Sequence, residues 1–225
     1  LDLDLVADSA PRGGAPRPES WVWEHAGTAA VSRRRGNRAA RSCATGSSRG
    51  MRMPELAPAP VRVRAYAPAD ASATLGVFVA AVTVTAAHDY APEQIAAWAR
   101  PGARSLGDWN RSMLARASLV AVRGGAIAGF SDVNGEGYID MMFVAPAHAR
   151  RGVASALLAA VFERARDLGA TRLWANVSVT ARPFFAARGF VIEAEQHPMI
   201  GGVELTNFRM SRPLPPIAAP SPRRG

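Results

Sequence analysis

The sequence contains no lysine and a single cysteine. All 27 of its basic residues are arginine, set against 18 acidic residues, and alanine, glycine and proline are abundant. Codon bias in a GC-rich genome explains this composition better than selection for nucleic-acid binding. The one cysteine, Cys43, excludes a disulfide framework and a metal site built from cysteines. No metal is predicted, and a reducing, cytoplasmic setting is favoured.

The positive charge is spread unevenly along the chain. Residues 1–58 contain 9 arginines and 6 acidic residues, residues 59–215 contain 16 and 12, and residues 216–225 contain 2 and none. The middle of the chain is therefore only mildly basic. The run RRRGNRAAR at 33–41 is the only support for a basic arm that binds acidic partners, so nucleic acid is disfavoured as a partner.

Composition divides the chain into three segments. Residues 1–58 are rich in Ala, Arg, Gly, Pro and Ser without helical or strand periodicity, which predicts a disordered extension. The first methionines, Met51 and Met53, directly precede the patterned region, so we interpret residues 1–50 as an upstream addition with no role in function. Residues 59–214 are predicted to form one domain, followed by a proline-rich tail at 215–225.

Hydrophobic periodicity in residues 59–214 predicts an α/β domain of the α+β type. Strands are expected at 61–66, 118–123, 126–133, 138–144, 171–177, 190–196 and 203–211, and helices at 71–87, 92–100, 153–168 and 180–188. Segment 105–117 is expected to be a helical turn or a lid-like loop. Glycine-rich turns predict antiparallel pairing of the three middle strands, and the helix that follows them predicts a parallel crossover.

The helix at 71–87 is almost uncharged and resembles a membrane span. It is about 17 residues long and contains Ser and Thr, whereas a span needs roughly 20 apolar residues. We therefore expect it to be buried inside the domain, and no membrane partner is predicted.

The helix at 153–168 begins without a capping side chain. Its first turn, RGVAS at 151–155, has no acidic or amide residue before it, so backbone N–H groups, the positive end of the helix dipole and two arginines converge there. Such a helix start binds anions, and a phosphate is the expected guest.

Three segments, in order and at the expected separations, resemble the GNAT superfamily of acyl-coenzyme A-dependent N-acetyltransferases. They are DMMFVAP at 140–146, RGVASALL at 151–158 and ARPFFAARGF at 181–190. The resemblance covers about residues 59–214. It implies a central mixed, mostly antiparallel twisted sheet of about seven strands flanked by about four helices.

The resemblance also implies acetyl-coenzyme A as the cosubstrate. The family holds the pyrophosphate of coenzyme A on backbone N–H groups, which here belong to Arg150, Arg151, Gly152, Val153, Ala154 and Ser155. A bulge in the strand at 138–144 would open a V for the pantetheine arm, which would pair with the backbone of Met142, Phe143 and Val144. One of those N–H groups would polarise the thioester carbonyl.

The sequence departs from the family pattern at three positions. Ala149 stands where glutamine or arginine is usual. Ser178 replaces a usual asparagine, and it is either a hydrogen-bond donor near the cofactor or a helix-capping residue. Phe185 replaces the tyrosine that usually protonates the departing thiolate, so water, another hydroxyl or no dedicated acid would serve.

Three residues are candidates for the general base. Asp140 and Tyr138 alternate onto one face of the bulged strand, where either could act directly or through water, and His88 lies where the family forms its acceptor pocket. Each has a structural alternative, such as an ion-paired aspartate. The expected mechanism is direct attack of a primary amine, from a small molecule or a peptide, in a ternary complex.

Two other classes of function remain open at this point. A module that binds acyl-coenzyme A as a sensor without turnover gains weight from Phe185, and an arginine-rich nucleic-acid-binding protein would bind through residues 1–58 with a steep salt dependence. A homodimer is one assembly that the sequence leaves open.

Overall fold

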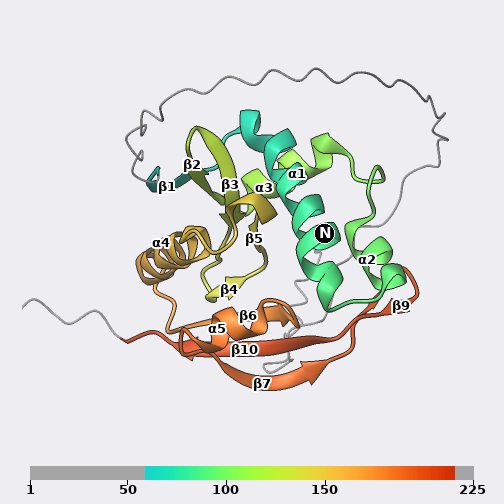
Figure 1. The fold of residues 1–225 in the computed structure, drawn as a ribbon. Coiled ribbons are helices and arrows are strands. Elements are labelled where there is room, and N and C mark those ends of the chain that lie inside the picture. The colour runs from blue at the N-terminus through green and yellow to red at the C-terminus, as the bar shows by residue number, and fades with distance from the viewer. Residues whose placement is uncertain (1–58, 216–225) are drawn as a thin grey trace, which may run out of the picture.

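The computed structural model describes residues 59–215 (Figure 1). The extension predicted at 1–58 lies outside these residues, as does all but the first residue of the tail predicted at 215–225. Both expectations stay predictions.

Five α-helices and ten strands make up the described part of the chain. The helices are α1 (Ala71–Ala80), α2 (Pro92–Ala99), α3 (Leu106–Ala115), α4 (Val153–Asp167) and α5 (Arg182–Ala186). The strands are β1 (Val61–Ala65), β2 (Leu119–Arg123), β3 (Ala126–Ser131), β4 (Tyr138–Ile139), β5 (Met142–Val144), β6 (Arg172–Ser178), β7 (Val191–Gln196), β8 (Met199–Ile200), β9 (Val203–Glu204) and β10 (Asn207–Pro213). A π-helical turn, Ala81–Thr85, continues α1, and 3-10 turns cover Pro68–Asp70, Ala86–His88 and Pro146–His148.

The strands form two four-stranded sheets and a small hairpin. The first sheet has the order β1-β2-β3-β5 and is antiparallel throughout. The second has the order β4-β6-β10-β7, in which β4 pairs with β6 in parallel and the other pairs are antiparallel. The strand expected at 138–144 is therefore two strands that belong to different sheets, because the chain changes partner between them.

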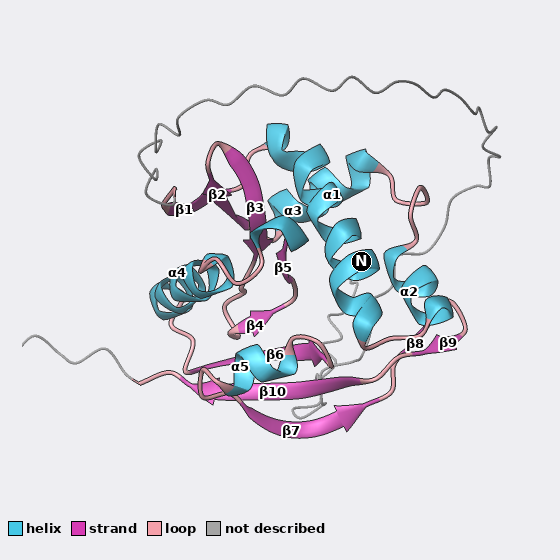
Figure 2. Ribbon diagram, in the orientation of Figure 1, coloured by secondary structure: helices cyan, strands magenta, loops and turns pink. Residues whose placement is uncertain are grey.

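Helices cover both faces of the first sheet (Figure 2). On one face, α1 and α3 enclose a core that contains Phe78, Trp109, Phe130 and Phe143. On the other face, Val153 of α4 packs with its neighbours against β3 and β5. Alternation along the strands sends neighbouring side chains to these opposite layers.

Segment 105–117, expected to be a turn or a loop, is the helix α3. The Ser105 side chain accepts a hydrogen bond from the Asp108 N–H at 3.3 Å and so caps its first turn. Trp109 and Met113 on one face of this helix are buried. Burial of these two large side chains stabilises a helix whose sequence alone gave a weak signal.

The helical run Pro68–His88 is 21 residues long, and by length and composition alone it is sufficient to cross a membrane. The length expected from the sequence was therefore too short, because the 3-10 and π turns extend the run. One third of its most apolar window is buried, including Val77, Phe78 and Val82. These residues belong to the core formed with α3 and the first sheet, as in the core helix of a globular domain.

Candidate active site

The two sheets separate at Asp140–Met141, between β4 and β5. Before this point Tyr138 pairs with Trp174 of β6, and after it Met142 pairs with Ser131 of β3. Because β5 pairs with β3 in the first sheet, whereas β6 pairs with β10 in the second, a gap opens between β5 and β6. This is the V-shaped split that the family resemblance implied.

Backbone hydrogen bonds show which way β5 presents its polar groups. The Asp132 N–H donates to the Met141 carbonyl at 3.2 Å, and the Ala145 N–H donates to the Ala128 carbonyl at 2.9 Å. Because antiparallel pairs alternate, Phe143 also bonds to β3, whereas the N–H and C=O groups of Met142 and Val144 point away from β3. Phe143, expected to offer its backbone, thus contributes its ring to the gap instead.

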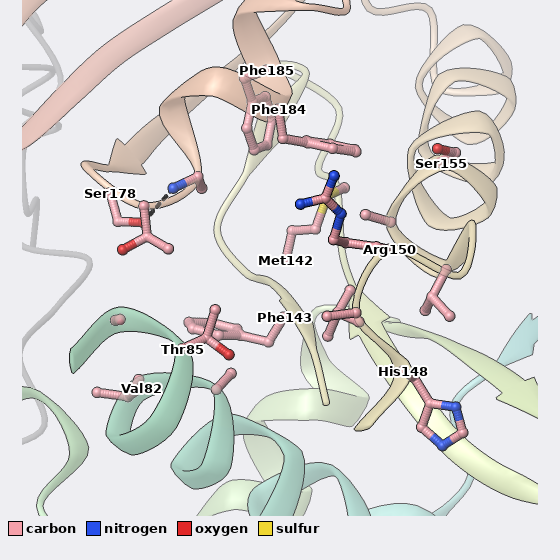
Figure 3. Close-up of a pocket in the computed structure, with 18 of the residues that line it drawn as sticks. Val82, Thr85, Met142, Phe143, His148, Arg150, Ser155, Ser178, Phe184 and Phe185 are labelled. Atoms are coloured by element: carbon pink, nitrogen blue, oxygen red, sulfur yellow. Dashed lines mark hydrogen bonds between the residues drawn. The ribbon is translucent and has the colours of Figure 1, made fainter. Parts of the chain in front are cut away.

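A cavity of about 640 Å³ occupies the gap (Figure 3). Its walls come from β5, the loop before α4, the end of β6, α5 and the helical turns after α1. It is lined by Ala81, Val82, Thr85, Ala86, Trp98, Met142, Phe143, Val144, His148, Ala149, Arg150, Gly152, Val153, Ala154, Ser155, Ser178, Thr180, Ala181, Phe184, Phe185 and Arg188. We call this cavity the cleft.

The loop before α4 forms a cradle at one end of the cleft. Arg150 and Gly152 have left-handed backbone conformations, with φ of 58° and 82°, so the chain turns sharply directly before the helix. The first helical hydrogen bond runs from the Ala156 N–H to the Gly152 carbonyl, and no side chain caps the helix start. The N–H groups of Val153, Ala154 and Ser155 thus precede the helical ladder.

The space around the cradle is open and basic. A Cβ built on Gly152 would meet no atom within 4 Å, so a ligand can approach the backbone closely. The first turn of α4 contains no acidic residue. Arg150 lines the cleft, whereas Arg151 is exposed and lies outside it. The geometry and the charge both suit a phosphate.

Arg188 also lines the cleft, although no role was predicted for it. Its Nη2 donates to Ser155 Oγ at 2.5 Å and its Nη1 donates to the Phe184 carbonyl at 3.2 Å. The guanidinium carbon lies 3.6 Å from the centre of the Phe184 ring. These contacts place a cation beside the first turn of α4. Its position directly before Gly189 in the third motif was the only available signal.

Ser178 and Phe185 both line the cleft. Ser178 Oγ accepts a hydrogen bond from the Ala181 N–H at 3.2 Å, which caps the turn into α5, and the serine hydroxyl keeps its own proton to donate. Phe185 is buried, and its ring packs edge-on against Phe190 at 5.0 Å between centroids. Phe185 therefore shapes the wall and has no proton to give.

Asp140, Tyr138 and His88 do not line the cleft. The Tyr138 hydroxyl donates to Asp140 Oδ1 at 3.3 Å, and the Tyr138 ring stacks on Trp174. Asp140 Oδ2 lies 3.5 Å from Arg116 Nη1. Burial raises the pKa of Asp140 against the opposing effect of Arg116. His88 is exposed at the end of the helical run.

Sequence reasoning also missed the wall formed by Val82 and Thr85, beside Trp98. Val82 and Thr85 belong to the π-helical turn after α1, and Trp98 is a buried residue of α2. A π turn is frequently found at functional sites, but no residue pattern announces it. Only the packing of α1 and α2 against β5 brings these side chains to the cleft.

Comparison with known proteins adds independent information. A family model described as an acetyltransferase (GNAT) domain matches residues 86–212. The chain is 36% identical over 150 residues to YafP, an uncharacterized N-acetyltransferase of Escherichia coli strain K12, across 67% of this chain and 94% of YafP.

Solved structures share the fold. A GCN5-related N-acetyltransferase from Rhodopseudomonas palustris matches with a TM-score of 0.66 and 31% identity, across 72% of this chain and 100% of that chain. The PaiA N-acetyltransferase of Thermoplasma acidophilum, solved with coenzyme A, has a TM-score of 0.57 and 16% identity, across 68% and 99%. YncA of Salmonella typhimurium, described as a putative acetyltransferase and solved with acetyl-CoA, has a TM-score of 0.55 and 20% identity, across 72% and 99%.

Proposed function

Since the chain belongs to the GNAT family of N-acetyltransferases, we propose that it transfers an acetyl group from acetyl-coenzyme A to a primary amine. The family and the mixed, mostly antiparallel fold that the sequence predicted are both confirmed. One observation carries the proposal: the split between β5 and β6 and the uncapped start of α4 open into the same cleft. A chain-like ligand with a phosphate at one end suits this arrangement.

The cradle would hold the phosphates of acetyl-coenzyme A. The backbone at Gly152 is open to a close approach, and the helix start supplies N–H donors and the positive end of its dipole. Arg188 adds a cation beside Ser155. Ala149 offers no side-chain donor there, and these two arginines, which both line the cleft, offset its absence.

The split strand would hold the arm that carries the acetyl group. Met142 and Val144 direct backbone groups away from β3, where an extended ligand can pair with them as an added strand. Val82, Phe143 and Phe184 supply apolar walls that exclude water. When bound, acetyl-coenzyme A supplies an acetyl group activated as a thioester. An N–H of Met142 or Val144 would donate to the thioester oxygen as negative charge develops there.

We assign the acceptance of the amine's proton to Asp140, acting through water. Burial raises the pKa of this carboxyl, which makes its ionised form a stronger base. Tyr138, two residues before it, donates a hydrogen bond to it and is the second candidate. His88, exposed on the turn between α1 and α2, is the third candidate.

The leaving thiolate would take its proton from water or from a hydroxyl of the cleft wall. Thr85, Ser178 and Thr180 supply such hydroxyls, whereas Phe185 supplies none. Attack by the amine would be direct, because residues 59–215 contain no cysteine that could carry the acetyl group. The acceptor class we propose is a primary amine of a small molecule or a peptide.

A sensor that binds acyl-coenzyme A without turnover is the second candidate. Phe185 favours it, because this ring stands where the family usually has a proton donor. Sensor and enzyme share the cleft and the expected cofactor affinity. They differ only in whether any amine is acetylated.

The first experiment is calorimetric titration of the full chain with acetyl-coenzyme A and with coenzyme A, followed by thiol release in the presence of a panel of amines. We expect micromolar binding and thiol release with at least one amine. The substitution Gly152→Glu should abolish binding, because it adds a negative charge and a strained left-handed residue to the cradle.

A matched control is Gly125→Glu, at the exposed turn between β2 and β3. Gly125 has φ of 81° and open space around its Cβ position, as Gly152 has, but it lies outside the cleft. Binding should survive this change. Binding without thiol release from any amine would favour the sensor, and absence of binding in the wild-type chain would refute both.

A further inference from the structure

The break between β4 and β5 is held by a buried side chain. Asp132, directly after β3, is 2% exposed. Its Oδ1 accepts hydrogen bonds from the N–H of Asp140 at 2.9 Å and from the N–H of Met141 at 3.1 Å. One carboxylate oxygen thus takes both N–H groups of the two residues at which the sheets part.

The N–H groups of Asp140 and Met141 require an acceptor outside the regular strand pairing. Asp140 and Met141 lie between the ladder of β4 with β6 and the ladder of β5 with β3, so regular strand pairing does not serve both groups. The Asp132 N–H does donate to the Met141 carbonyl, but the Met141 N–H donates to the Asp132 side chain and not to its backbone. A buried N–H without a partner is costly, and a charged acceptor forms the stronger hydrogen bond.

The charge on Asp132 is balanced from α3. Arg116, at the end of that helix, places Nε 2.8 Å from Asp132 Oδ2, an ion pair by distance although the angle is poor for a hydrogen bond. The same guanidinium reaches Asp140 at 3.5 Å and contacts the sulfur of Met141 at 3.4 Å. Asp132 and Arg116 therefore clamp the break from β3 and from α3.

We propose that Asp132 is a positioning residue that sets the strand split and, through it, the backbone groups of Met142 and Val144 that would bind acetyl-coenzyme A. This inference rests on the proposed function. Asp132 itself does not line the cleft. It acts through Met141, which lies one residue before the first of the two backbone contacts.

A purely structural role predicts a different result, and Asp70 provides the comparison. Asp70 is also buried, lies 2.6 Å from Arg64 Nη1 and accepts the Ala67 N–H at 2.9 Å. It precedes α1 and does not line the cleft. Loss of either carboxylate removes an ion pair and a backbone acceptor, so both losses should lower the melting temperature.

The experiment compares Asp132→Ala, Asp132→Asn and Asp70→Ala in the full chain, well below their melting temperatures. We expect Asp132→Ala to raise the Kd for acetyl-coenzyme A about tenfold, since two backbone hydrogen bonds lose their acceptor. Asp132→Asn keeps an acceptor oxygen for the N–H pair and should raise Kd only about threefold. Asp70→Ala should leave Kd unchanged.

Amide hydrogen exchange without ligand gives a readout independent of binding. Exchange at Asp140 and Met141 should accelerate in Asp132→Ala, less in Asp132→Asn and not in Asp70→Ala. If wild type binds acetyl-coenzyme A and Asp132→Ala or Asp132→Asn binds equally well, the inference is wrong while the proposed function stands. If Asp132→Ala does not fold, the Asn variant decides. If wild type does not bind, both fail.

Discussion

At the scale of single residues, burial decides how Asp132 responds to pH. Its pKa is raised to about 6, because loss of solvent disfavours the ionised carboxyl more than Arg116 favours it, and Asp140 adds repulsion. A carboxyl whose pKa is raised in the folded state contributes its full stabilisation at pH values below its pKa in the unfolded state. That contribution is lost as pH rises through about 6.

As the pH falls from 7 to 5, the free energy of unfolding of wild type should therefore rise by about 1 kcal/mol relative to that of Asp132→Asn. Urea denaturation at the two pH values measures it. Asp70→Asn is the control, because Arg64 lowers the pKa of Asp70 and its contribution stays nearly constant above pH 5. If the difference in unfolding free energy between wild type and Asp132→Asn stays constant or falls toward pH 5, the raised pKa of Asp132 is contradicted.

Arg188 is the second residue whose contacts lead to a prediction. Arg188→Ala should raise the Kd for coenzyme A about tenfold, because it removes a cation held beside the first turn of α4. Calorimetry measures the change. Arg182→Ala, at the start of α5, is a matched control, since Arg182 stacks on Phe208 and does not line the cleft. An equal loss of affinity for coenzyme A in Arg188→Ala and Arg182→Ala would show a general effect of positive charge instead.

At the scale of elements, the approach of α4 to β3 decides where the cradle stands. A Cβ on Gly129 would lie 2.7 Å from the Phe143 carbonyl, 3.0 Å from Val153 and 3.1 Å from Leu157. Only a glycine permits this contact between the middle of β3 and the first turns of α4. The position of the uncapped helix start relative to β5 follows from it.

Gly129→Ala should destabilise the fold by about 1–3 kcal/mol, because α4 or β5 must shift to admit the methyl group. Thermal and urea denaturation measure the loss. Gly135→Ala is the control, since a Cβ there meets nothing within 4 Å and φ is not left-handed. Unchanged stability of Gly129→Ala would mean that the helix moves freely against the sheet.

At the scale of the whole molecule, the order of elements followed from the sequence. Periodicity and turn residues located the α4 helix, the hairpins around 124–125 and 134–137, and the parallel return to β6. These signals are local, because hydrophobic spacing and glycine positions act within a few residues. At 138–144 the family resemblance predicted one bulged strand, and its division into β4 and β5 of different sheets was not predicted.

The sequence by itself determined the cradle: Gly152, its neighbouring arginine Arg150 and a helix start without a cap are adjacent in the chain, so their chemistry can be read in order. Only the tertiary structure decided that Asp132 and Arg116 hold the break between β4 and β5, and that Arg188 donates a hydrogen bond to Ser155. These contacts join residues from different elements, and no periodicity encodes them. They exist because the core packs α3, β3, α4 and α5 around one split strand.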